Sequence, residues 1–245
     1  MFFAVSIVSG GKGRKVTGSN PKTKDNGSKH VAAYKAIKRL IVDHKLVPGQ
    51  KLIYRDLEES LGMSKTPIIN GLMMLEQEGI VVCKKNRGFF MKEVSVEEAE
   101  QIYDLREKLE AISIDYAVAN YEQEDLEILE EKLNLYKDYQ APVYDRKRLQ
   151  YDTDFHMQIA RMGKNTFFTS MIRQFYENIY FTLNVVYLTP NIENFKRDHD
   201  LILHAVKERE LGKARKTLKA HTLAARKLLV AALKASAKGV LQPFP

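Results

Sequence analysis

The chain has 245 residues, which fits one large domain or two small ones. Its hydrophobic content of 44% and charged content of 29% exclude a mostly disordered or fibrous protein. The single cysteine, Cys83, excludes an internal disulfide framework and a multi-cysteine metal site, so we expect a reducing, cytoplasmic environment. The apolar opening Met1–Val8 is too short to span a membrane and lacks the positive charge of a signal peptide, so we expect no membrane association.

The positive charge is concentrated at the N-terminal end. Residues 1–94 carry 17 Lys and Arg against 8 Asp and Glu, whereas residues 95–245 carry 22 against 23. This asymmetry favours a polyanion such as nucleic acid as the partner of the first part, with a solvated basic surface as the alternative. Residues 1–29 are expected to form a flexible basic arm, native or added, because the tract 10–29 has no hydrophobic periodicity.

Residues 30–94 have the pattern of a helix-turn-helix. A first helix is predicted from His30 to the Pro48-Gly49 break, a second over 54–61, and a third over 65–78. Gly62 supplies the tight turn and Ser64 the N-cap of the third helix. The third helix is predicted to turn inward its apolar stripe of Ile68, Leu72 and Leu75.

A β-hairpin is predicted directly after the third helix. The runs Ile80–Cys83 and Phe89–Met91 favour strands, and the residues between them favour a turn. The tip carries Lys84, Lys85 and Arg87. A basic hairpin after a candidate recognition helix indicates a winged helix-turn-helix, whose second helix enters the major groove of double-stranded DNA.

The stretch Ala33–Lys92 resembles the DNA-binding domain of the GntR family of bacterial transcription regulators. The resemblance is carried by Pro48-Gly49-Gln50-Lys51-Leu52, Arg55-Asp56-Leu57, Leu61-Gly62-Met63-Ser64-Lys65-Thr66-Pro67 and Leu75-Glu76-Gln77-Glu78-Gly79-Ile80. It implies that DNA is approached by Arg55, Lys65, Thr66, Arg87 and Gly88.

The recognition helix departs from the family pattern, since Ile69-Asn70-Gly71 stands where Arg-Glu-Ala is common. Asn prefers adenine whereas Arg prefers guanine, so Asn70 predicts an A·T-biased operator. Met73 and Met74 stand where basic residues are frequent, which leaves more of the phosphate contact to Lys84, Lys85 and Arg87. Alternatively, Ile69 and Met73 pack against another part of the protein.

Residues 95–236 are predicted to form an all-α bundle of six helices, followed by a tail at 237–245. The Ser95–Glu98 capping box opens the first helix, whose inward stripe is expected to be Ile102, Leu105, Leu109 and Ile112. The fourth helix is predicted over 166–187. The fold class is therefore mostly α: a winged helix-turn-helix followed by a helical ligand-binding domain.

Four polar residues interrupt the apolar stripes of this bundle. Asp152 and His156 lie one turn apart on the third helix, His199 lies on the fifth and His221 on the sixth. Such ligands suit a divalent transition metal. Periodicity alone leaves open that the histidines are hydrogen-bonded core residues.

The segments Asp152–His156, Asp198-His199, Ala220-His221 and Leu105-Arg106 resemble the FCD ligand-binding domain, which follows the GntR-type reader in one large subgroup. The resemblance implies that Asp152, His156, His199 and His221 hold one divalent ion per chain, with zinc first and nickel or manganese as alternatives. Six helices are similar to the VanR-type arrangement of this subgroup.

These observations predict a homodimeric transcription regulator, in the commoner case a repressor, that binds an inverted-repeat operator and responds to a metabolite. A small carboxylate is the expected effector, held by the metal and by Arg106, although a salt bridge to Glu110 is an equal alternative for Arg106. A metal-dependent enzyme and a purely structural metal are the rival hypotheses. No His-Glu-x-x-His pair, nucleophile elbow or phosphate-binding loop occurs in the sequence, so we predict that the chain is not an enzyme.

Overall fold

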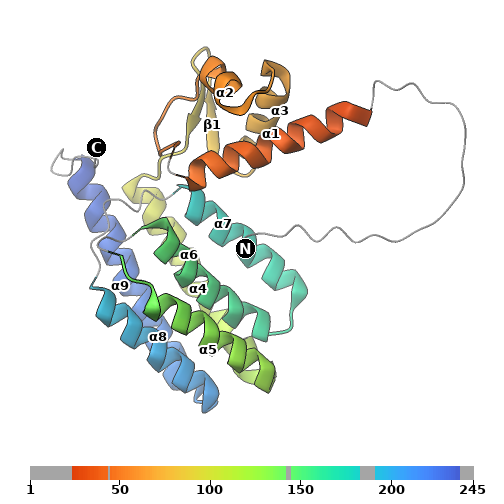
Figure 1. Cartoon of the computed structure of the whole chain (residues 1–245). Helices are drawn as coiled ribbons and strands as arrows, with labels where there is room; N and C mark the ends of the chain where they lie inside the picture. Colours follow the sequence, from red (N-terminus) through yellow and green to blue (C-terminus); the bar gives the residue numbers. More distant parts are fainter. Residues whose placement is uncertain (1–23, 44, 142–144, 183–190, 238–245) are drawn as a thin grey trace, which may run out of the picture.

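The computed structural model describes residues 24–43, 45–141, 145–182 and 191–237. The described chain has a small N-terminal part with a β-hairpin and a larger part made of helices, and α1 crosses the end of the helical part nearest the hairpin (Figure 1). Within these residues, none of the helices has the length and apolar character that crossing a membrane requires.

The N-terminal part is a winged helix-turn-helix, as predicted. It comprises α1 (Lys24–Val42), α2 (Tyr54–Leu61), α3 (Lys65–Gln77), β1 (Val81–Lys84) and β2 (Gly88–Met91). The strands pair antiparallel with Val81 opposite Met91, and Lys51 forms an isolated bridge with Phe90. The stripe of α3 is fully buried as expected, at Ile68, Leu72 and Leu75.

Two local details differ from the predictions for this part. Helix α1 begins at Lys24, six residues before the expected start at His30, so the last residues of the predicted arm are helical. Extending an existing helix needs no new nucleus, so residues without hydrophobic periodicity can continue it. Ser64 is the N-cap of α3 by position, but its side chain makes no capping hydrogen bond.

The larger part is an all-α bundle with six described helices. These are α4 (Val96–Asn120), α5 (Gln123–Asp138), α6 (Arg146–Met162), α7 (Thr166–Thr182), α8 (Ile192–Lys207) and α9 (Leu211–Ala237). Ser95 caps α4 by accepting a hydrogen bond from the Glu98 amide, and Asp145 caps α6 through the Arg148 amide. The expected continuation of α7 to residue 187 lies outside the described residues, as does most of the predicted arm and tail.

The inward face of α4 was predicted correctly only in part. Leu109 is buried and Ile102 packs against the core as expected, but Leu105 and Ile112 are 47% and 40% exposed, whereas Arg106 and Glu110 are buried at 4% and 2%. Periodicity selects the apolar stripe, but buried polar side chains are tolerated when they satisfy one another. The Arg106 Nε donates to the Glu110 carboxylate at 2.6 Å, and this pairing turns the polar stripe inward.

One continuous apolar core joins the two parts. A single cluster of buried side chains includes Ile37 of α1 and Leu75 of α3 together with Ile179 and Phe181 of α7 and Leu229 of α9. We call the winged helix-turn-helix the DNA reader. Because native interiors are closely packed, the reader has little freedom to move relative to the bundle.

The crossing of α1 and α3 depends on Gly71. A Cβ atom at this position would lie 2.8 Å from the Tyr34 amide nitrogen and 3.2 Å from the Ala33 carbonyl carbon. Backbone atoms cannot move aside as a flexible side chain can, so any larger residue would force the helices apart.

We therefore expect Gly71→Ala to destabilise the protein by about 1–3 kcal/mol, although alanine is the better helix former. Gly212→Ala is the matched control, because Gly212 is also helical and a Cβ there meets nothing within 4 Å. The control should gain up to about 1 kcal/mol. Urea unfolding of both variants measures the difference, and equal effects at the two positions would contradict the proposed backbone contact.

Candidate metal centre and nucleic-acid interface

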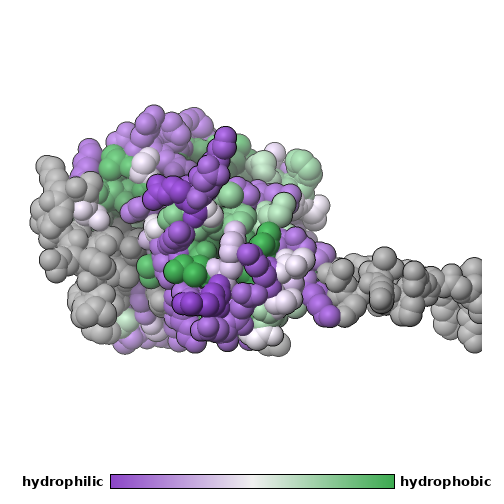
Figure 2. Space-filling model, turned by 90° about the horizontal axis from the view of Figure 1, so that it is seen from above, coloured by the Kyte–Doolittle hydropathy of each residue, from purple (hydrophilic) through white to green (hydrophobic). Residues whose placement is uncertain are grey.

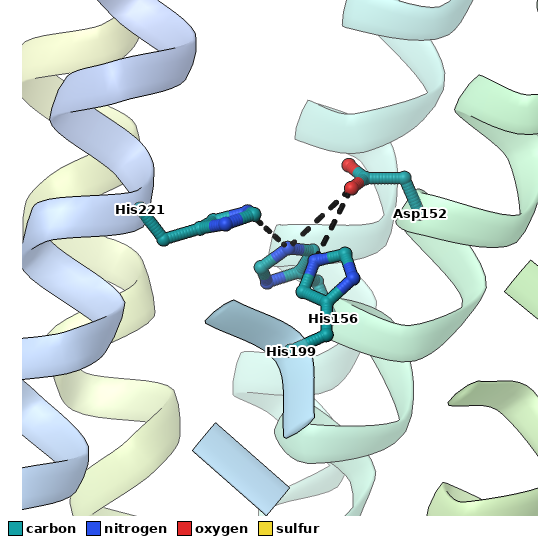
Figure 3. A group of neighbouring side chains, drawn as sticks. All are labelled: Asp152, His156, His199 and His221. Carbon is teal, nitrogen blue, oxygen red and sulfur yellow. Dashed lines mark hydrogen bonds and ion pairs between the residues drawn. The ribbon is translucent and has the colours of Figure 1, made fainter. Parts of the chain in front are cut away.

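The bundle brings together the four polar residues singled out in the sequence. Asp152 and His156 come from α6, His199 from α8 and His221 from α9, and their side chains converge in the interior (Figure 3). One nitrogen or carboxylate oxygen from each residue lies within 4.8 Å of the others. All four residues are buried, and the two histidines of α8 and α9 are fully inaccessible.

The separations of the ligand atoms fit a small cation. The two Nε2 atoms of His156 and His221 are 3.3 Å apart, and His199 Nε2 lies 3.3 Å from the Oδ1 atom of Asp152. The His156 Nε2 atom is 4.0 Å from the same oxygen. Tetrahedral ligands at zinc distances are separated by about 3.4 Å, so the observed spacing leaves room for one such ion with little movement.

Several polar atoms of this cluster make no hydrogen bond within the described chain. The Nε2 and Nδ1 atoms of His199 and the Nδ1 atom of His221 are buried without a hydrogen bond. Leaving buried polar atoms unpaired costs free energy, and coordination by a cation would compensate this cost at His199 Nε2. The donor set of three imidazoles and one carboxylate therefore fits a divalent transition metal.

The electrostatic environment holds Asp152, His156 and His199 in the form that binds metal. Burial lowers the pKa of His156 to about 3, although the nearby Glu110 and Asp152 carboxylates oppose the shift. Burial and the neighbouring His221 also lower the pKa of His199. For Asp152, burial favours the neutral acid, but the adjacent His199 and His156 rings and the Arg106 guanidinium outweigh it and lower the pKa. Neutral imidazoles and an ionised carboxylate are the states that coordinate metals.

Glu110 contacts the cluster at the Nδ1 atom of His156, and the sequence did not indicate this role. Its carboxylate accepts hydrogen bonds from Arg106, from the Tyr176 hydroxyl and from Thr222 Oγ1, and its Oε2 atom lies 3.4 Å from His156 Nδ1. Burial works against this charge, yet the positive and hydrogen-bonding neighbours lower the pKa of Glu110 to about 2. A carboxylate at Nδ1 fixes the imidazole tautomer that presents Nε2 to a metal.

Arg106 contacts both the carboxylate of Glu110 and Asp152 of the candidate ligand cluster. One of its terminal nitrogens, Nη2, is buried without a hydrogen bond and lies 3.7 Å from Asp152 Oδ2. The salt bridge to Glu110, considered as the alternative for this residue, is thus present at 2.6 Å. The guanidinium retains an unsatisfied donor, which is the feature needed to bind an additional anion.

Seven of the residues expected to approach DNA are exposed on the winged part. Exposed side chains belong to Arg55 on α2, to Lys65, Thr66 and Asn70 on α3, and to Lys84, Lys85 and Arg87 on the wing. Seen from the side of this part, hydrophilic residues cover much of the surface, with hydrophobic residues among them (Figure 2).

Local contacts position several of these basic side chains. The Lys65 Nζ atom lies 5.2 Å from the ring centroid of Tyr54, and Lys84 and Arg87 lie 4.6 and 5.4 Å from that of Phe90. The positive φ of 85° at Gly88 allows the tight wing turn. A hydrogen bond of 3.1 Å from the Cys83 amide to Glu76 ties the wing to α3.

The exposed face of α3 also carries Met73, whose side chain is 50% exposed, whereas Ile69 is partly buried. Thr66, Asn70 and Met73 are spaced four and three residues apart and therefore share one face. The packing alternative for Met73 finds no counterpart within the described residues, since half of its surface remains accessible.

A winged helix-turn-helix with a basic outer face, joined to a helical domain, is the architecture of a DNA-binding protein. Residues 29–91 match the model of the bacterial regulatory proteins of the gntR family, and residues 101–224 match the FCD domain. The chain belongs to the GntR family of transcription regulators and carries an FCD domain.

Relatives and solved structures agree with this assignment. The chain is 23% identical over 190 residues to the HTH-type transcriptional regulator YdhC of Bacillus subtilis, covering 77% of this chain and 85% of that protein. It is 27% identical to the regulator McbR of Escherichia coli over 172 residues, covering 67% and 76%. Both relatives and the matching family are transcription regulators, which confirms the prediction that the chain is not an enzyme.

Two solved structures have the same fold. The E. coli McbR/YncC structure superposes with a TM-score of 0.65 at 22% identity, covering 85% of this chain and 98% of that one. A putative GntR regulator from Rhodococcus sp. RHA1 gives a TM-score of 0.68 at 18% identity, covering 84% and 99%.

Replacing one of the four candidate ligands should abolish metal binding, whereas replacing an exposed histidine of the same helix should not. We expect His199→Ala to lower the metal content of the purified protein from about one ion per chain to near zero, because a coordinating imidazole is lost. His204→Ala is the matched control, since His204 lies on the same helix but is exposed. Elemental analysis after incubation with zinc measures both variants. Retention of the ion by His199→Ala would show that this histidine is a core residue and not a ligand.

Proposed function

We propose that this protein is a metabolite-responsive regulator, in the commoner mode a repressor, that binds an inverted-repeat operator as a homodimer in the cytoplasm. Its signal is a small carboxylate received at a divalent metal in the helical domain. The observation that carries the proposal is the buried cluster of three histidines and Asp152 beside the unsatisfied Nη2 atom of Arg106.

Asp152, His156, His199 and His221 would hold the ion, with zinc first and nickel or manganese as alternatives. A bound divalent metal supplies a Lewis-acidic position that accepts a carboxylate oxygen. Arg106 would bind the second oxygen of the carboxylate through its free donor, while Glu110 keeps the guanidinium in place. The six described helices of the bundle support placing the chain in the VanR-like, metal-binding branch of the subgroup.

The reader would contact DNA with α3 in the major groove and with the wing at the adjacent backbone. Thr66 and Asn70 on the exposed face of α3 are suited to contacts in the major groove, and Arg55 and Lys65 to the phosphates beside it. Lys84, Lys85 and Arg87 at the wing tip, with the close backbone approach that Gly88 permits, are suited to the adjacent backbone.

An exposed apolar face supports the dimer. Leu105, Ile112 and Tyr116 on α4 are between 38% and 47% exposed, and Phe167 and Met171 on α7 are 81% and 45% exposed. The two helices meet here, because the Tyr116 ring contacts Phe168 edge-on at 5.8 Å. Apolar side chains that gather in this way mark a surface that another protein covers, and a second copy would supply the second reader.

The metal-assisted site is tested by titrating the zinc-loaded protein with a panel of small carboxylates. We expect Arg106→Lys to keep its zinc but to bind the responsive carboxylate about tenfold more weakly or worse, because lysine cannot make the forked contact. Isothermal calorimetry measures the affinity and circular dichroism checks the fold. Equal affinity of wild type and variant would limit Arg106 to its salt bridge with Glu110. Unfolding on zinc removal would instead indicate a structural ion.

The reader is tested by selecting binding sites from random duplexes. We expect two inverted half-sites rich in A·T pairs, as a dimer with Asn70 on its reading face requires. Asn70→Ala should relax the preference at one base pair by about 1–3 kcal/mol. Arg87→Gln should weaken binding to all sequences alike and reduce the salt slope by about 1. A selected site without inverted symmetry would contradict the dimeric mode of reading.

A further inference from the structure

Helix α7 contacts His156 of the candidate metal centre with one side and the DNA reader with the other. The Tyr176 ring stacks on His156 with centroids 6.3 Å apart, and its hydroxyl donates to Glu110. Two residues later, Asn178 Nδ2 donates to the backbone oxygen of Glu78 at 2.7 Å. Residues two apart on a helix differ by about 200° in direction, so the two side chains face opposite ways.

The partner of Asn178 is the end of the reading helix. Glu78 is the C-cap of α3, and its own amide bonds to the Met74 oxygen of that helix. Gly79 follows with a φ of 71°, and a Cβ there would lie 3.2 Å from Asn178 Nδ2. Asn178 is thus seated against the turn that ends α3.

Further contacts make this junction stiff. Lys38 of α1 lies 2.7 Å from the Glu78 carboxylate and 3.7 Å from that of Glu177, the residue between Tyr176 and Asn178. The Tyr34 hydroxyl also donates to Glu78 at 2.6 Å, and Phe181 is buried in the core shared with α1 and α3. A displacement of α7 therefore reaches the reading helix without loose contacts to absorb it.

We propose that α7 couples the metal centre to the reader, with Asn178 as the positioning residue that ties the end of α3 to it. A change at the centre that alters the Tyr176–Glu110 contact shifts α7, and Asn178 transmits the shift to Glu78 and Gly79. The use of this coupling as regulation rests on the proposed function, whereas the mechanical link itself does not. Coupling requires an energetic interaction between the two ends, and this interaction is measurable.

The test follows amide hydrogen exchange of Glu78, Gly79 and Ile80, whose N–H groups bond to carbonyls of α3. It uses the full chain as wild type, Tyr176→Phe, Asn178→Ala and the double variant. We expect Tyr176→Phe to accelerate this exchange about fivefold, the factor for one net hydrogen bond. In the Asn178→Ala background the same substitution should have less than about a twofold effect, because the link is already broken.

An equal effect of Tyr176→Phe in both backgrounds, or no effect in either, would overturn the coupling. Ser170→Ala on the exposed side of α7 is the control and should leave exchange unchanged. Asn178→Asp, which keeps the shape but loses the donor, replaces Asn178→Ala if the latter fails to fold.

A parallel measurement with zinc and with a chelator separates the two proposals. A zinc effect on exchange that disappears in Asn178→Ala supports both the metal centre and its coupling to the reader. If zinc has no effect while the Tyr176→Phe result holds, the metal sensor fails and the mechanical link stands.

Discussion

The helical domain depends on the buried carboxylate of Glu110. It accepts hydrogen bonds from three side chains on three helices, α4, α7 and α9, and it lies within 3.4 Å of a histidine on a fourth, α6. Without this acceptor the buried guanidinium of Arg106 would lose its 2.6 Å ion pair and keep only the 3.7 Å contact with Asp152, which is destabilising in a core. The polar stripe of α4, the orientation of His156 and the placement of α7 all follow from satisfying this one group.

The cluster of Asp152 and the three histidines lies deep in the bundle. Helix α6 is enclosed by its neighbours, and even its Arg146 and Arg148 are buried. Desolvation keeps imidazoles neutral, so the cluster presents lone pairs where an exposed site would present partly protonated rings. Burial also leaves several polar atoms without a hydrogen bond in the described chain. A bound cation would compensate part of this cost by coordination.

Much of this architecture could be predicted from sequence because its signals are local. The helices and the pair of Asp152 and His156 are indicated by the helical period of 3.6 residues, and the turns are indicated by glycine. The convergence of His199 and His221 with them needed the family resemblance, because spacing within one helix says nothing about neighbouring helices. The inward turn of Arg106 and Glu110 was missed, since the adjacent Leu105 and Ile112 offered a more apolar face. The contact of Asn178 with Glu78 joins residues 100 positions apart and has no local signal.

The close crossing at Gly71 has a consequence for how such a reader can change. Because α3 is held against α1 by backbone contact and by its buried stripe, its orientation owes little to Thr66, Asn70 and Met73 on the opposite face. Under the proposed mode of DNA binding, substitutions on that face would alter which bases are contacted while the packing beneath stays the same. New operator preferences would then be accessible by single substitutions that the fold tolerates, and regulators with the same scaffold could diverge in the genes they control.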